Sequence, residues 1–152
     1  MAETTMPRVH HKTFAYQTSL EWIGARAGVA ASPDKVPVRV SAPPEFKGEA
    51  GVWTPEDLFL AAAETCLMTT FLALTGRAAI RVSSYTSQAD GTLEFIDGGY
   101  RMTRIVLRPV IAVADADEIP RAQEALARAH ETCIISNSMR TDVAVEPEFR
   151  AA

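Results

Sequence analysis

The stretch from residue 54 to residue 67, TPEDLFLAAAETCL, begins the longest helix that the sequence predicts. Thr54 is a favoured N-cap residue, and Pro55 suits the first helical position because its missing N–H needs no partner there. The acids that follow face the positive end of the helix dipole. We therefore expect a helix that begins at Thr54 and ends at Thr75, before Gly76.

This helix is apolar on nearly every side over residues 58–74, and it contains three consecutive alanines. Small side chains let another backbone approach closely, and a helix that is apolar all round has to be buried all round. One sheet covers only one flank of a helix. Another helix or a second subunit is expected to cover the rest.

Alternating apolar and polar residues predict strands on both sides of the helix. ADG and DGG are favourable turn sequences in the second group of strands, and Pro109 places part of the last one at an edge or a bulge. A second helix carries an apolar stripe that includes Cys133 at its end. The predicted strands cover residues 14–22, 25–31, 36–40, 80–88, 92–97, 100–114 and 143–146, and the second helix covers residues 117–133.

Because the strands come in runs and do not alternate with helices, the expected fold class is α+β. The chain has 152 residues, which fits one domain with one sizeable core. We expect a flexible tail over residues 1–8 and a single domain over residues 9–152.

The formal net charge of −4 and the lack of a dense Lys/Arg run argue against a nucleic-acid partner. The N-terminus has no apolar signal core, and Glu64 and several threonines interrupt the longest apolar stretch. We expect a cytoplasmic protein that does not enter a membrane. The three dispersed histidines do not favour a metal site.

Two cysteines, Cys66 and Cys133, lie far apart in the sequence and match neither a CxxC redox motif nor a zinc-binding spacing. In a reducing cytosol a cysteine pair that forms a disulfide is more often catalytic than structural. The alternative is that each cysteine is a small buried apolar side chain. Composition alone leaves both interpretations open.

Two motifs contain these cysteines. The stretch over residues 54–67 resembles the helix motif of the OsmC/Ohr hydroperoxide reductases, in which Pro-Glu precedes the cysteine as Glu56 precedes Cys66. The stretch AHETCIISNSMR, residues 129–140, resembles the second cysteine motif of that family, with His130 before Cys133 and Ser-Asn after it. Together with the connecting VRVSAPPEFKGEAG, the resemblance spans most of the chain.

The resemblance implies an OsmC-like fold, with antiparallel sheets wrapped around two core helices in an intertwined homodimer. It also implies a peroxidase cycle without a cofactor, in which Cys66 attacks an organic hydroperoxide and becomes a sulfenic acid. Cys133 then condenses with it to a disulfide. An external dithiol reduces this disulfide, and lipoylated proteins are the usual donors in the family.

Only a thiolate is nucleophilic, and burial of a thiol raises its pKa, so the site needs a group that favours the anion. The resemblance implies an arginine, for which Arg39 and Arg26 are the candidates, with Glu56 holding it and relaying a proton. Glu56 lies about 15 Å from Cys66 along a continuous helix. Either the helix is broken near its start or Glu56 comes from a partner subunit.

Apolar residues near the cysteine would favour alkyl or lipid hydroperoxides over hydrogen peroxide, although they are equally consistent with plain core. Ile134 stands where the family commonly has proline, and Glu64 where it usually has a small residue. A paralogue that lacks peroxidase activity and binds an apolar small molecule is therefore the alternative. The candidate substrate-binding residues are Trp53, Leu67, Met68 and Phe71.

Overall fold

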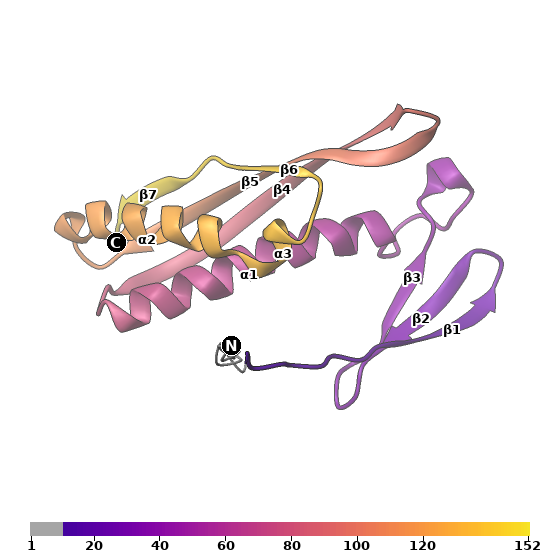
Figure 1. The fold of residues 1–152 in the computed structure, drawn as a ribbon, viewed down its shortest axis with the longest axis horizontal. Helices are drawn as coiled ribbons and strands as arrows, with labels where there is room; N and C mark the ends of the chain where they lie inside the picture. Colours follow the sequence, from indigo (N-terminus) through magenta and orange to yellow (C-terminus); the bar gives the residue numbers. More distant parts are fainter. Residues whose placement is uncertain (1–10) are drawn as a thin grey trace, which may run out of the picture. The chain divides into compact units, whose positions relative to one another are not determined.

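The computed structural model describes residues 11–152 (Figure 1). It divides into two compact units, one ending at Trp53 and one spanning Thr54–Ala152. The predicted tail, residues 1–8, lies outside the described residues. The single domain over residues 9–152 stays a prediction.

The N-terminal unit contains a three-stranded antiparallel sheet in the order β1-β2-β3, which confirms the predicted meander. Its strands are β1 (Ser19–Gly24), β2 (Ala27–Ala31) and β3 (Val38–Ser41). The first strand begins later than predicted, because β2 pairs with β1 only as far as Ser19. Phe14 and Tyr16 alternate with polar residues but pair with no strand and are exposed. The loop that follows β3 contains only the 3-10 turn η1 (Pro44–Phe46).

The long helix α1 (Pro55–Arg77) begins where the sequence predicts. Thr54 Oγ1 accepts a hydrogen bond from Asp57 N at 3.1 Å, and Asp57 Oδ2 accepts one from Thr54 N at 2.9 Å. The predicted end is wrong by two residues, since the helix continues through Gly76. The residue with a left-handed backbone is Ala79, with φ of 54°, so Gly76 does not terminate the helix.

The reciprocal cap at Thr54 predicts a measurable loss of stability on substitution. Replacing Thr54 with alanine leaves the backbone N–H of Asp57 without its acceptor, and we expect the free energy of unfolding to fall by about 1 kcal/mol. Urea denaturation followed by circular dichroism measures this. Thr69→Ala is the control, because the Thr69 hydroxyl is exposed and donates only to helix carbonyls. An equal loss in both variants would contradict a specific effect of the cap.

A four-stranded sheet forms most of the C-terminal unit, and its two longest strands are β4 (Val82–Ile96) and β5 (Gly99–Val113). Asp97 and Gly98, with φ of 49° and 81°, join them in a tight hairpin, as the DGG sequence predicts. The second predicted turn, ADG, is wrong because β4 runs through it. Gly91 packs closely against α1 there, since a Cβ atom would lie 2.7 Å from Leu60 Cδ1 and the leucine side chain would have to shift.

The C-terminal strands β6 (Asp142–Val145) and β7 (Glu148–Ala151) both pair in parallel with β5, so this sheet is mixed and not antiparallel throughout. Only β6 was predicted. β5 as a whole is not an edge strand, because it has neighbours on both sides, although the edge predicted for part of it is present beside Pro109. Pro109 is tolerated there, since it has a register partner in neither β6 nor β7, which pair with β5 on either side of it.

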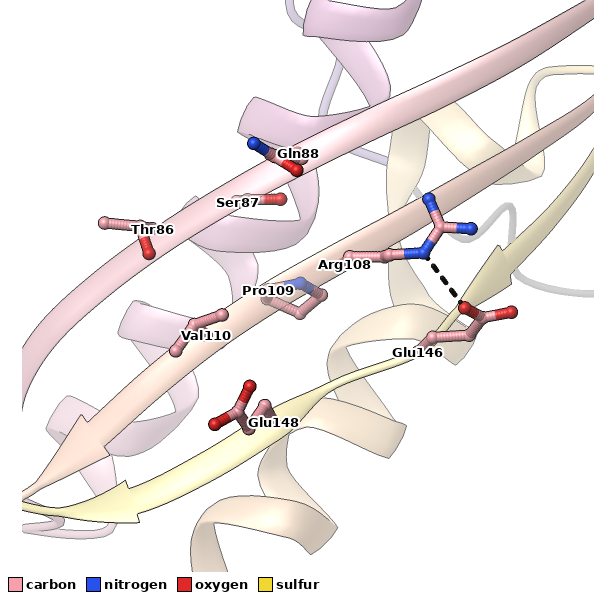
Figure 2. Close-up of a pocket in the computed structure, with 8 residues that line it drawn as sticks. All are labelled: Thr86, Ser87, Gln88, Arg108, Pro109, Val110, Glu146 and Glu148. Atoms are coloured by element: carbon pink, nitrogen blue, oxygen red, sulfur yellow. Dashed lines mark hydrogen bonds and ion pairs between the residues drawn. The ribbon is translucent and has the colours of Figure 1, made fainter.

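Figure 2 shows the outer surface of the sheet around this proline, where Arg108 reaches Glu146 at 3.1 Å. A pocket here is lined from β4, β5, β7 and the link between β6 and β7. Its arginine is held between Glu146 and Asp90, and neither cysteine lines it. This pocket is therefore not a candidate for thiol chemistry.

The second predicted helix, residues 117–133, is present as α2 (Ile119–Thr132), with the 3-10 turn η2 (Ala116–Glu118) before it. A further short helix, α3 (Ile134–Asn137), follows Cys133 and was not predicted. Cys133 itself is extended, with φ of −62° and ψ of 113°. The predicted apolar stripe is confirmed, because α2 packs with α1 and β5 in one core on one face of the sheet (Figure 1). The buried residues of this core are Ala63, Leu67, Phe71, Ile80, Ile105, Leu107, Ile111, Val113, Ala122, Leu126 and Ala129.

One side of α1 stays open in the single chain. Leu58 is 38% exposed and Leu72 is 40% exposed, on an otherwise apolar helix. By length and composition α1 could cross a membrane, but its other side, with Leu67 and Phe71, is packed into the core of this unit. Within the C-terminal unit, the expected burial of α1 on all sides is thus met on only one side of the helix.

Candidate active site

The two cysteines lie in contact. Cys66 comes from the middle of α1 and Cys133 from the junction of α2 and α3, and the thiol of Cys133 donates a hydrogen bond to the sulfur of Cys66. Both are free thiols. Cys133 is completely buried, whereas Cys66 is partly exposed, so an approaching molecule reaches Cys66 first.

The change of chain direction at Cys133 brings the backbone at the start of α3 to the sulfur of Cys66. Because Cys133 is extended, α3 starts afresh after α2 and packs against α1. The backbone N–H groups of Ile134 and Ile135 both donate to the sulfur of Cys66. The hydroxyl of Thr70, one helical turn after Cys66 on α1, donates to it as well.

These donors determine the ionisation of Cys66. Burial raises the pKa of its thiol, but the hydrogen bonds from Ile135 N–H, Cys133 S–H, Thr70 and Ile134 N–H outweigh it, so the pKa of Cys66 lies below its usual value. All of these donors belong to the C-terminal unit. Hydrogen bonds within this unit therefore favour the thiolate, and the contribution of an arginine stays a prediction.

Both candidate arginines lie in the N-terminal unit. Arg39 Nη2 forms an ion pair with Glu49 Oε1 at 2.8 Å, and Arg26 Nη1 donates to the carbonyl oxygen of Phe46 at 3.0 Å. Neither is among the groups that lower the pKa of Cys66. Their roles in the site stay predictions.

Glu56 lies in the first turn of α1, and the helix is continuous from there to Cys66. The first alternative, a helix broken near its start, is therefore wrong, and Glu56 lies about 15 Å along the axis from Cys66 of its own chain. Oε2 of Glu56 is buried, with no hydrogen-bond partner within residues 11–152. A buried carboxylate oxygen without a donor is costly. The role of Glu56 in the site stays a prediction.

The four candidate substrate-binding residues do not form one group. Leu67 and Phe71 are 1% and 0% exposed and belong to the core, which favours the plain-core interpretation for both. Met68 is partly buried on α1, and Trp53 is half-exposed in the N-terminal unit. Beside the cysteines there is a surface groove between α1 and α2, with Thr70, Arg77 and Arg128 in its lining.

Comparison with protein-family models identifies the family of this chain. Residues 48–148 match the model of the OsmC-like protein family. The chain belongs to this family. The suspected relationship is thereby confirmed, together with the OsmC-like α+β fold.

Two relatives and one solved structure are similar over most of the chain. The uncharacterized protein YmaD of Bacillus subtilis (strain 168) is 23% identical over 91% of this chain and 93% of its own length. Peroxiredoxin OsmC of Escherichia coli (strain K12) is 26% identical over 70% of this chain and 73% of its own. The OsmC-like protein of unknown function VCA0330 from Vibrio cholerae superposes with a TM-score of 0.81 at 25% identity, covering 89% and 99% of the two chains.

Ile134 stands where the family commonly has proline, and this difference affects the thiol of Cys66 directly. A proline has no N–H, so an OsmC-like protein with proline at this position lacks one of the donors that Cys66 has here. The departure therefore favours the thiolate in this chain. It gives no reason to infer loss of activity.

Ile134→Pro tests this donor with little other disturbance. Ile134 is the first residue of α3, where proline is favoured, and the extended backbone of Cys133 is compatible with a following proline. We expect the pKa of Cys66 to rise, so that the rate of alkylation by iodoacetamide at pH 7 falls about threefold and its pH profile moves upward. Ile134→Val keeps the N–H and should leave the profile unchanged. Identical profiles for both variants would contradict the role of this N–H.

The departure at Glu64 faces away from the cysteines. The titratable group that Glu64 affects is Tyr85 on β4. Burial raises the pKa of Tyr85 to about 12, with a smaller contribution from the charge of Glu64. Glu64 is not among the groups that shift the pKa of Cys66.

The sequence analysis missed three of the groups at the site. Thr70 had a recognisable signal, because a residue four positions after Cys66 lies on the same face of the helix. The backbone N–H groups of Ile134 and Ile135 had none, since every residue except proline carries one. His130, which precedes Cys133 in the second cysteine motif, lines a pocket between α2 and the C-terminal strands, and its Nδ1 is buried without a partner in the described chain.

Proposed function

We propose that this protein reduces organic hydroperoxides to alcohols with Cys66 as the peroxide-reactive thiol and Cys133 as the resolving thiol. Membership of the OsmC-like family supports a peroxiredoxin-like activity. The observation that carries the specific mechanism is the hydrogen bond between the two thiols, with the pKa of Cys66 lowered by its donors.

In the first step the thiolate of Cys66 attacks the terminal oxygen of the hydroperoxide. The O–O bond breaks, Cys66 becomes a sulfenic acid, and the alkoxide leaves as the alcohol after taking up a proton. In the second step Cys133 attacks the sulfur of Cys66, its thiol proton leaves with the hydroxide as water, and the disulfide forms. An external dithiol, for which we propose a lipoylated protein, then reduces the disulfide and is itself oxidised.

We further propose that the working unit is an intertwined homodimer in the cytoplasm. The open side of α1, with Leu58 and Leu72, is apolar and suits a second copy of the chain. The buried, unpartnered Oε2 of Glu56 supports a site completed by the partner subunit, where Glu56 would meet Arg39 or Arg26 beside the other Cys66. Light scattering after size exclusion, on wild type and on Leu72→Glu, tests the dimer.

The decisive experiment is a titration of free thiols after one equivalent of cumene hydroperoxide is added to the reduced protein. The proposed function predicts the loss of two thiols per chain, with one equivalent of alcohol produced. Peptide mapping should then show Cys66 linked to Cys133. Retention of both thiols would remove the proposal.

A second candidate function is favoured by one pocket. Between α2 and the C-terminal strands the side chains of Leu126, Val145 and Phe149 line a depression of about 420 Å³ that would accept an apolar small molecule. A binding protein without peroxidase activity would show saturable binding of an apolar fluorescent probe that is unchanged by Cys66→Ser. It would show no turnover of hydroperoxide.

A further inference from the structure

The hydroxyl of Ser136 contacts the resolving cysteine. Ser136 Oγ lies 3.3 Å from Cys133 Sγ, in the first turn of α3. A thiol has only one proton, and that of Cys133 is directed to Cys66. Ser136 is therefore the donor and the sulfur of Cys133 is the acceptor.

This contact differs from those of several other helical hydroxyls in the same unit, although Thr70 also donates to a sulfur, that of Cys66. Thr75, Thr132 and Ser138 each donate to a backbone carbonyl four residues earlier, which is the usual bond of a hydroxyl within a helix. Ser136 donates to a sulfur atom. Cys133 occupies the N-cap position of α3 without accepting a capping hydrogen bond from it, so its sulfur is free to accept from Ser136.

We propose that Ser136 is a catalytic residue that stabilises negative charge on the sulfur of Cys133, an inference that rests on the proposed function. When Cys133 gives up its proton to attack the sulfenic acid, negative charge develops on its sulfur; as the S–S bond forms, this charge passes to the hydroxide, which takes up the proton and departs as water. When an external thiolate attacks Cys66 in the disulfide, the S–S bond breaks and its electron pair passes to Cys133. Cys133 is fully buried, so Ser136 stands in for the water that would otherwise solvate this charge in both steps.

The test separates the two chemical steps. One equivalent of cumene hydroperoxide is mixed rapidly with each reduced variant; sulfenic acid is trapped with dimedone, and remaining thiols are counted after acid quench. In Ser136→Ala we expect sulfenic acid to form at a rate within about twofold of wild type and the disulfide to form about tenfold more slowly, so that the trapped sulfenic acid accumulates. Ser136→Thr keeps the hydroxyl and should restore at least about half of the wild-type rate of disulfide formation.

Ser138→Ala is the matched control, because it removes a hydroxyl from the end of the same short helix without touching either sulfur. It should leave both steps unchanged. The proposal is overturned if Ser136→Ala forms its disulfide as fast as wild type, if both steps slow equally, or if Ser136→Thr is as slow as Ser136→Ala. Failure of the proposed function is recognised separately, because the wild-type protein would then form no sulfenic acid.

Discussion

Replacing Cys66 with serine is expected to abolish hydroperoxide consumption, with a rate at least on the order of a thousandfold below that of the wild type. The thiol of Cys66 accepts four hydrogen bonds that favour its anion. A serine hydroxyl at the same place stays protonated at neutral pH and is a poor nucleophile toward an O–O bond. The variant should still fold, because serine is nearly the size of cysteine and position 66 is partly exposed.

Cys133→Ser is the matched control for this loss. It leaves Cys66 able to attack, so we expect one equivalent of cumene hydroperoxide to be consumed and the reaction to stop at a sulfenic acid that dimedone traps. Consumption of hydroperoxide by Cys66→Ser at the wild-type rate would contradict Cys66 as the reactive thiol. Equal, complete loss of the first turnover in both variants would contradict the division of roles between the two cysteines.

The parts of the fold that the sequence predicted are those with strong local signals. The cap at Thr54 and the Asp97-Gly98 hairpin each depend on a few neighbouring residues, and both occur as predicted. The apolar stripe that ends at Cys133 was likewise correct, since burial of one helix face is recorded in its periodicity.

The errors in the predicted fold arose where contacts between distant parts of the chain determine the local structure. Gly91 was taken as a turn residue, whereas it makes room for Leu60 from α1, a contact between distant parts of the chain. β7 was missed because its short, charged sequence pairs with β5, far away in sequence. Neither contact leaves a local pattern.

The sequence predicted the two reactive sulfur atoms of the site, but it predicted only some of the groups that could stabilise the thiolate. Motif resemblance paired Cys66 with Cys133, and their hydrogen bond agrees with that pairing. The resemblance implied a charged side chain, Arg39 or Arg26, as the group that favours the thiolate. The backbone donors at the start of α3 became visible only when the extended conformation of Cys133 was known.

Mixing two inactive variants is expected to restore activity if Glu56 acts across the dimer. Glu56→Gln alone should slow hydroperoxide consumption about a hundredfold, because the amide cannot accept a proton or hold an arginine. Cys66→Ser alone should be inactive. In a mixed dimer one site combines Cys66 of the first chain with Glu56 of the second, so a 1:1 mixture that exchanges subunits freely should regain about a quarter of the wild-type activity.

The distance within one chain makes this outcome decisive. On the continuous helix α1, Glu56 lies about 15 Å along the axis from its own Cys66, too far for one carboxylate to serve that thiol. If Glu56 acted on its own chain, no mixed dimer would contain an intact site, and the mixture would stay as slow as Glu56→Gln. A mixture of Cys66→Ser with Cys133→Ser is the negative control. Every mixed dimer then lacks one cysteine in each site, so catalytic turnover should not return although subunits exchange.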